Sequence, residues 1–210
     1  RLPIHTHLGE ARLETPLIGD FNAQNLVLVL AVLLTLNFPL AAAVNALSRL
    51  KSVSGRLEAF GGTERCPRIY VDFAHSPDSL ERVLRVLRAL SAARVLCVFG
   101  CGGNRDRSKR PLMGAIAERF ADQVYLTADN PRDENPRVIT SEILAGFTLP
   151  ARVTVIEDRP AAISAALNAA APDDIVLIAG KGHETEQEIA GRVIPMSDQA
   201  LVRDWLAGHA

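Results

Sequence analysis

The sequence predicts an α/β protein with a Rossmann-like, doubly wound and mostly parallel sheet. Five short apolar runs, rich in β-branched residues, alternate with segments in which apolar residues recur every three or four positions. The runs cover residues 69–73, 95–99, 124–127, 153–156 and 175–179. Short, continuously apolar strands separated by helices are typical of parallel sheets that are buried on both faces.

The first 48 residues follow a different pattern. Residues 1–19 contain short extended pieces, and two helices are expected after them, one from Asp20 and one after Pro39. In the first helix Leu26, Val29 and Leu30 recur at helical spacing. There is no initiator methionine, and the opening is typical of the middle of a domain, so we expect the C-terminal part of a longer protein.

Four helices are expected between or after the five strands. They cover residues 80–90, 112–120, 160–170 and 197–206, and Pro111 is suited to the first turn of the second of them. Each crossover then connects two parallel strands, which is the repeat of a doubly wound sheet.

Composition excludes several classes of protein. The 23 basic and 24 acidic side chains give a net charge of −1, which provides no electrostatic basis for binding nucleic acid or a membrane surface. No apolar run reaches the roughly 18 residues of a membrane span, and no signal segment opens the chain. Three cysteines without a CxxC pair indicate reduced thiols and a cytoplasmic protein, with Cys97 in the core of a strand.

Polar segments follow four of the five predicted strands. They read DFAHSPDS (residues 72–79), GCGGNRDRSKR (100–110), ADNPRDE (128–134) and AGKGHETEQ (179–187). Ligands of doubly wound sheets bind beyond the carboxyl ends of the strands, so four polar loops at that edge predict a binding site.

The residue types in these loops indicate a charged ligand. The three glycines of segment 100–110 precede Arg105, Arg107, Lys109 and Arg110 and could form an anion cradle, although the segment matches neither a P-loop nor a dinucleotide fingerprint. Arginines beside a carboxylate suit an amino acid, whose ammonium Glu184 or Asp129 could take. His183 is either a ligand contact or a capped surface residue, and no two histidines have zinc-ligand spacing.

Six segments together resemble the Mur ligases, and among them the members that add meso-diaminopimelate. The segments are FNAQN, SGRLE, VDFAHSPDSL, FGCGGNRDRSKRPLMGAIA, ADNPR and AGKGHE, in this order and spacing, and the resemblance covers essentially the whole chain. It implies that residues 1–48 are the tail of a central ATP-binding domain and that residues 49–210 are the C-terminal amino-acid-binding domain.

The resemblance also implies a reaction in peptidoglycan synthesis. ATP, with Mg²⁺, phosphorylates a carboxylate of UDP-N-acetylmuramoyl-L-Ala-D-Glu, and the amine of the incoming amino acid then attacks the acyl phosphate to form an amide. Because the P-loop is not in these 210 residues, we expect them to be inactive alone, and they carry no assigned catalytic residue or metal ligand. A monomer is expected.

Site residues are implied by the same resemblance. Arg132 would bind the carboxylate at the far end of meso-diaminopimelate, with Asn130 beside it. Lysine-adding relatives resemble Asp-Asp-Pro-Asn at residues 129–132, which removes this guanidinium. The full set implied for meso-diaminopimelate is Arg105, Asp129, Asn130, Pro131, Arg132, Gly180 and Glu184. The set implied for ATP is Asn22, Asn25, Arg56, Asp72 and His75.

Two alternatives are open. One is a lysine-adding relative, which the arginine at position 132 disfavours. The other is a non-catalytic module that binds an amino acid or a nucleotide, which the absence of a P-loop would fit. The opening of the chain favours a truncated ligase over such a module.

Overall fold

The computed structural model describes residues 1–90 and 93–209. They form two compact units, Arg1–Ser52 and Val53–Ala210. Each unit has its own core, and each is described by itself.

The first unit is a hairpin packed on two helices. Strands β1 (Leu2–Thr6) and β2 (Gly9–Leu13) pair antiparallel and are followed by helices α1 (Asp20–Thr35) and α2 (Leu40–Ser48). Its core is formed by Ile4, Leu13, Leu26, Leu30, Ala43 and Leu47. Leu26 and Leu30 are buried as the helical spacing predicts, whereas Val29 is 43% exposed, so the buried stripe of α1 is narrower than expected.

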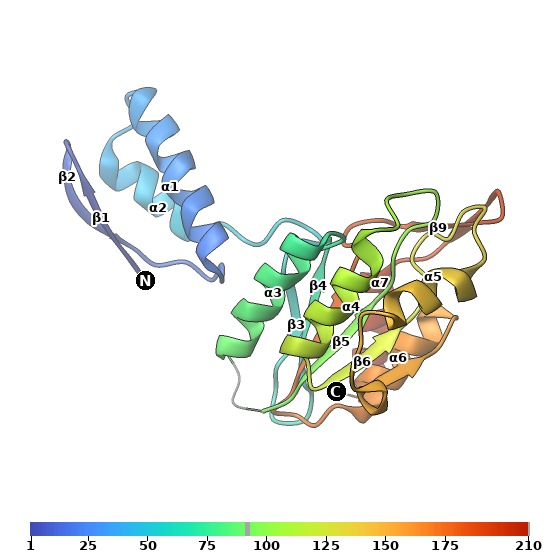
Figure 1. Ribbon diagram of the computed structural model, residues 1–210. Helices are drawn as coiled ribbons and strands as arrows, with labels where there is room; N and C mark the ends of the chain where they lie inside the picture. The colour runs from blue at the N-terminus through green and yellow to red at the C-terminus, as the bar shows by residue number, and fades with distance from the viewer. Residues whose placement is uncertain (91–92, 210) are drawn as a thin grey trace. The chain divides into compact units, whose positions relative to one another are not determined.

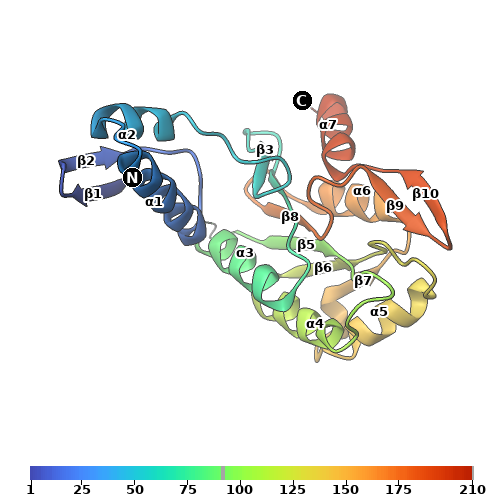
Figure 2. The ribbon, with the colours of Figure 1, turned by 90° about the horizontal axis from the view of Figure 1, so that it is seen from above.

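The second unit is a six-stranded sheet between two layers of helices. The strand order is β3-β4-β8-β5-β6-β7, with β3 antiparallel to β4 and all other neighbours parallel. Helices α3, α4 and α5 cover one face, and α6 and α7 cover the other (Figures 1 and 2). This arrangement confirms the predicted Rossmann-like, doubly wound fold.

The five predicted strands are present within one residue at each end. They are β4 (Arg68–Asp72), β5 (Val95–Phe99), β6 (Gln123–Leu126), β7 (Val153–Val155) and β8 (Ile175–Ala179). The four predicted helices are α3 (Pro77–Leu90), α4 (Lys109–Phe120), α6 (Arg159–Ala169) and α7 (Asp198–His209). Pro111 lies in the first turn of α4, where its missing N–H costs no hydrogen bond.

Five elements of the second unit were not predicted. They are β3 (Glu58–Gly61), α5 (Pro136–Leu144), the short 3₁₀ helix Pro150–Arg152, β9 (Glu186–Ile189) and β10 (Arg192–Pro195). Strands β9 and β10 form a separate antiparallel hairpin after β8. This hairpin matters for the site because residues 186–188 lie beside the 128–134 loop.

The core of the second unit explains the strand sequences. Ile69, Val71, Leu96, Val98, Val176 and Ile178 project from one face of the sheet onto α6 and α7. Small residues of α6, such as Ala162 and Ala166, let the helix approach the strands closely. Burying each large aliphatic side chain contributes about 1.5–3 kcal/mol, so these positions account for much of the stability of the unit.

One buried ion pair connects the helices of this face to the sheet. The guanidinium of Arg159 in α6 donates to both carboxylate oxygens of Asp198 in α7, each at 2.8 Å, and to the carbonyl of Ala179 at 3.0 Å. Both side chains are fully buried. Across residues 1–90 and 93–209, no helix is long and apolar enough to cross a membrane.

Candidate functional site

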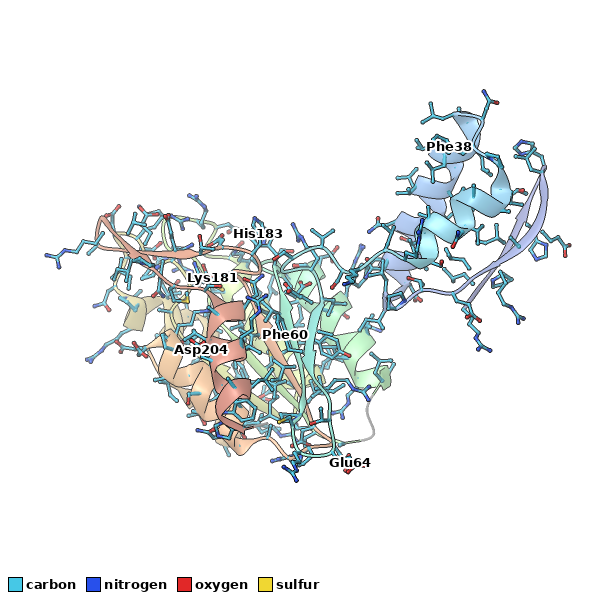
Figure 3. All side chains as sticks on the ribbon, turned by 180° about the vertical axis from the view of Figure 1, so that it is seen from behind. Phe38, Phe60, Glu64, Lys181, His183 and Asp204 are labelled. Atoms are coloured by element: carbon cyan, nitrogen blue, oxygen red, sulfur yellow. The ribbon has the colours of Figure 1, made fainter. Side chains whose placement is uncertain are left out.

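The four polar loops converge at the carboxyl edge of the parallel strands. The register of β4 and β8 puts Asp72 beside Ala179, so the loops that follow these strands start together. Lys181 and His183 lie at this edge, and Glu64 lies at the opposite end of the unit (Figure 3). The predicted convergence is therefore present.

Two glycines allow the loops to approach one another. A Cβ atom at Gly103 would lie 1.9 Å from the carbonyl oxygen of Pro131, which no side chain tolerates. Gly180 has φ +115°, and a Cβ there would lie 2.5 Å from Oδ2 of Asp129. These two close approaches place the 100–110 and 179–187 segments against the 129–132 segment.

Asn130 lies at the centre of a hydrogen-bonded cluster. Its Nδ2 donates to Glu184 Oε2 at 2.9 Å, and its Oδ1 accepts from Lys181 Nζ at 2.9 Å and from the backbone N–H of Glu188 at 3.0 Å. Lys181 Nζ also donates to Glu184 Oε2 at 2.7 Å. The cluster joins the loops after β6 and β8 to the start of the β9–β10 hairpin.

The environment of Glu184 favours its ionised form. Partial burial raises the pKa of the carboxyl group, but the hydrogen bonds from Lys181 and Asn130, together with the positive charge of Lys181, hold the pKa below its ordinary value. Glu184 is therefore a carboxylate at neutral pH, which can attract a cation.

Arg132 connects the 129–132 segment to the hairpin. Its backbone is left-handed, with φ +51°, which is unusual for a residue with a side chain. The N–H of Arg132 donates to the carbonyl of Glu188 at 3.0 Å, and its carbonyl accepts from Ala190 at 2.7 Å. Its guanidinium donates from Nη1 to Gly103 at 2.9 Å and pairs through Nε with Glu188 at 3.1 Å. These contacts hold a strained backbone in place.

A pocket of about 370 Å³ opens at this cluster. Its walls carry three carboxylates and a buried amide, and two of the carboxylates are already paired, Glu184 with Lys181 and Glu188 with Arg132. The lining residues are Asn130, His183, Glu184, Thr185, Glu186, Glu188 and Val193. Arg132 reaches the same region through its pair with Glu188.

Three of the four basic side chains of segment 100–110 bind other groups of the protein and do not form the predicted anion cradle. Arg110 is fully buried and pairs with Glu134 at 2.9 Å and Glu142 at 2.5 Å, and Arg107 also pairs with Glu142. The ammonium of Lys109 donates to the carbonyl of His75 at 2.7 Å. The two arginines are neutralised by glutamates that lie 24 to 35 positions later in the chain. A local sequence pattern could not reveal these pairs.

Arg105 differs from the other cations of its segment. Its side chain is exposed, and its guanidinium donates to the carbonyl of Asn104 at 3.0 Å. A Cβ at Gly102 would lie 3.1 Å from Nη1 of Arg132 and 3.7 Å from Cγ of Arg105, so the two arginines flank this glycine. They bring two positive charges to one side of the site.

A second group of predicted residues surrounds Phe73. The guanidinium of Arg56 lies 4.6 Å from the centre of its ring, and the rings of His75 and His183 lie 4.6 and 5.4 Å away. Phe73 was not predicted, because a half-buried aromatic residue at a strand end has no distinctive sequence signal. It brings Arg56 and His75 together beside the 179–187 segment.

Asp72 stabilises this group through the backbone. Its two carboxylate oxygens accept from the N–H groups of Leu57 at 2.7 Å and Ala74 at 2.8 Å. Burial raises the pKa of Asp72, although these hydrogen bonds and the charge of Arg56 oppose the rise. Asp72 thus fixes the residue that follows Arg56 rather than presenting an open carboxylate.

The remaining two predicted residues, Asn22 and Asn25, lie in the first unit, in the first two turns of α1. Asn22 donates from Nδ2 to the carbonyl of Ile18 at 2.8 Å, and Asn25 is exposed. Their spacing of three places them on neighbouring positions of one helix surface.

Lys181 is the main residue of the site that the sequence did not reveal. A lysine between two glycines is ordinarily a solvent-exposed loop residue, yet its side chain is fully buried here. The only available signal was the lysine–glutamate spacing of three directly after a buried strand. No group of three or more His, Cys, Asp or Glu side chains that could hold a metal occurs in residues 1–90 and 93–209.

Together, these observations define a doubly wound α/β domain with a candidate ligand site, built from charged side chains, at the carboxyl ends of its strands. The sequence profile described as "Mur ligase, glutamate ligase domain" matches residues 55–182, and the chain belongs to this family.

Curated relatives narrow the comparison. The chain is 50% identical over 195 residues to the UDP-N-acetylmuramoyl-L-alanyl-D-glutamate–2,6-diaminopimelate ligase of Coxiella burnetii, covering 93% of this chain and 40% of the relative. It is 50% identical over 204 residues to the enzyme of that name from Ralstonia nicotianae, covering 96% and 40%. The chain therefore spans about two fifths of the length of these relatives.

A solved structure agrees with this result. A structure of a UDP-N-acetylmuramoyl-L-alanyl-D-glutamate–2,6-diaminopimelate ligase matches with a TM-score of 0.73 and 39% sequence identity, over 98% of this chain and 42% of that one. Both units of the chain thus have counterparts in one known protein.

Proposed function

We propose that the chain is the C-terminal part of an ATP-dependent ligase that adds meso-diaminopimelate to UDP-N-acetylmuramoyl-L-Ala-D-Glu in peptidoglycan synthesis. Residues 1–48 would be the tail of the central ATP-binding domain, and residues 49–210 the amino-acid-binding domain. The observation that carries the proposal is the Asn130–Glu184 cluster with Arg132 beside it, because it presents both charges that an amino-acid head requires.

The distal end of meso-diaminopimelate carries the charges that the Asn130–Glu184 cluster and Arg132 can bind. The molecule has a second amino-acid head where lysine has only an ammonium. In the proposed complex Arg132 and Arg105 bind the distal carboxylate, and Glu184 binds the distal ammonium. Asn130 fixes Glu184, while Asp129, Pro131 and Gly180 set the backbone around the ligand.

Arg132 retains the capacity to bind a carboxylate. Its Nη1 and Nε donate to Gly103 and Glu188, and no partner is recorded for Nη2 within the described part of the chain. Its side chain is 21% exposed, so a ligand can reach it. A bidentate complex through Nε and Nη2 would release Glu188, whose carboxylate is 44% exposed and lines the pocket.

ATP contacts are proposed for residues of each unit. Arg56 and His75 flank Phe73 and would contact ATP, with Asp72 fixing the turn that carries Arg56. Asn22 and Asn25 would contact the adenine from the first unit. ATP with Mg²⁺, held mainly by the rest of the protein, would supply the phosphoryl group that activates the substrate carboxylate.

The residues of this chain would then orient the attacking amine. Binding one end of meso-diaminopimelate at Arg132 and Glu184 fixes the other end, so its amine meets the activated carboxyl group in a defined geometry. Positioning alone can supply several kcal/mol of the barrier reduction. The 210 residues by themselves are expected to release no ADP, because this proposal places the P-loop outside them.

The test uses the full-length protein with ATP, Mg²⁺ and UDP-N-acetylmuramoyl-L-Ala-D-Glu, and it measures phosphate release with meso-diaminopimelate and with L-lysine. Charge-assisted hydrogen bonds contribute about 1.5–3 kcal/mol, so Arg132→Ala should lower kcat/KM for meso-diaminopimelate roughly 10- to 150-fold. Arg137→Ala is the matched control, because that arginine is 81% exposed and pairs with Glu157 away from the pocket.

Three results would change the conclusion. Equal use of lysine, or no effect of Arg132→Ala, would retain the ligase and exclude the assigned specificity. If neither amino acid leads to phosphate release, a non-catalytic binding module is favoured.

A further inference from the structure

Lys181 is a charged residue at the candidate site to which neither the sequence nor the proposed function assigns a role. Its side chain has no solvent exposure, which is rare for a lysine because burying an ammonium is costly unless it is paired. Its two recorded partners are Asn130 Oδ1 at 2.9 Å and Glu184 Oε2 at 2.7 Å. Both partners are proposed ligand contacts.

The contact with Lys181 determines how the amide of Asn130 is oriented. The side-chain oxygen must face the ammonium, because an amide N–H₂ cannot accept from a cation. Oδ1 also accepts from the N–H of Glu188 at 3.0 Å, so two donors fix the same orientation. Nδ2 is then directed to Glu184, where it donates at 2.9 Å.

The same contact determines which oxygen of Glu184 is available to a ligand. Oε2 accepts from both Lys181 and Asn130, whereas no partner is recorded for Oε1 in the described residues. The side chain is 34% exposed and lines the pocket. A turn closed by the N–H of Glu184 and the carbonyl of Lys181, at 2.9 Å, fixes the backbone between them.

We propose that Lys181 is a positioning residue for amino-acid binding: its buried ammonium orients Asn130 and Glu184 so that Oε1 of Glu184 faces the ligand ammonium. The inference rests on the proposed function, which it deepens. Lys181 itself does not contact the ligand.

A purely structural role would have a different signature. A buried ion pair is weak evidence for stability, because apolar residues of similar volume often serve equally well. If Lys181 only filled space or stabilised the fold, its replacement would lower the active fraction and leave the affinity for the amino acid unchanged. If it positions the cluster, affinity for the amino acid changes selectively.

The experiment compares Lys181→Met, Lys181→Arg and the control Lys51→Met in the full-length enzyme. Lys51 is an exposed residue of the first unit and is not part of the cluster, so its replacement makes the same chemical change without altering the cluster itself. Steady-state phosphate release gives kcat and separate KM values for meso-diaminopimelate, ATP and the UDP-dipeptide. A crystal structure of Lys181→Met shows where Asn130 and Glu184 lie.

For Lys181→Met we expect KM for meso-diaminopimelate to rise roughly 10-fold or more, since hydrogen bonds to charged groups are lost. The KM values for ATP and the UDP-dipeptide should stay unchanged, and Lys181→Arg should recover part of the loss. In the Lys181→Met crystal structure Asn130 and Glu184 should separate. An unchanged KM for the amino acid, or a fall in kcat alone, would overturn the inference.

The outcome for Lys181 can be separated from the outcome for the proposed function. If the wild-type enzyme uses a different amino acid, the assigned substrate is wrong, and the KM for that amino acid then tests Lys181. If the wild-type enzyme uses no amino acid, the proposed function fails, and the crystal structure of Lys181→Met then tests the role of Lys181. Asn130 and Glu184 remaining in their present contact without the lysine would show that Lys181 does not position them.

Discussion

The buried pair of Arg159 and Asp198 leads to the most sharply defined prediction. Asp198→Ala leaves a fully buried guanidinium without its counter-charge, since both side chains have no solvent exposure. Removing one partner of such a pair costs about 3–5 kcal/mol, a large fraction of the 5–15 kcal/mol stability of a typical domain. Asp198→Asn keeps the shape of the side chain and should still lose most of this free energy, because the charge is absent.

Urea unfolding followed by the fluorescence of Trp205 measures this effect. Trp205 is the single tryptophan of the chain, and it lies in α7 and packs against the core beneath α6. Its indole N–H donates to Asn168 of α6 at 2.7 Å, so its emission reports the contact between these two helices.

The control for this prediction is an exposed ion pair. In the pair of Arg137 and Glu157 the side chains are 81% and 46% exposed, and Glu157→Ala should cost no more than about 1 kcal/mol. The double variant Arg159→Met with Asp198→Leu should recover most of the lost stability, because no buried charge remains. A loss for Asp198→Ala no larger than for Glu157→Ala would refute the reasoning.

Three further predictions concern the loops and the core. Gly103→Ala should destabilise the chain by about 1–3 kcal/mol or more in urea unfolding, because its Cβ would lie 1.9 Å from a backbone oxygen. At Gly208 an added Cβ would meet no atom within 4 Å beyond the local helix backbone, so Gly208→Ala should be neutral or slightly stabilising. Hydrogen bonds from the buried Arg110 lower the pKa of Glu134 to about 2. The stability that Glu134 contributes is therefore complete above its unfolded pKa of about 4.3 and is lost as the pH falls toward about 2. Glu134→Gln should reduce the acid dependence of the unfolding free energy, and an unchanged dependence would contradict this. Burial raises the pKa of both Cys97 and Cys101 to about 12, so neither should react with a thiol reagent at neutral pH until the protein is unfolded, and rapid labelling of the native chain would show that they are accessible.

The sequence predicted the parallel strands because burial on both faces leaves a simple signature. Continuous runs such as residues 95–99 and 175–179 have no other common explanation at that length. Helix α5 was not predicted, because an Asn-Pro pair is typical of turns as well as of helix starts. In the structure Asn135 caps the helix by accepting from the N–H of Arg137 at 3.0 Å, and Pro136 occupies its first position.

The site was less predictable than the fold because its chemistry depends on contacts between distant segments. Polar loops at one edge of the sheet follow from topology, and that prediction is confirmed. Topology does not predict which basic side chains remain free to bind a ligand, since Arg110 is neutralised by glutamates 24 and 32 positions away. The burial of Lys181 depends likewise on Asn130, 51 positions earlier in the chain.

The order of strands in the sheet has a consequence for synthesis on the ribosome. Strand β8 is the last of the parallel strands to be made, yet it lies between β4 and β5 and hydrogen-bonds to both. Until residues 175–179 emerge, the two earlier strands have no common neighbour, and the nascent chain exposes apolar surface that β8 will later cover. Contacts of such long sequence separation slow folding and lengthen the time during which apolar surface is exposed to aggregation. Lys181 and Glu184 follow directly after β8, so the candidate site can assemble only once β8 has paired with β4 and β5.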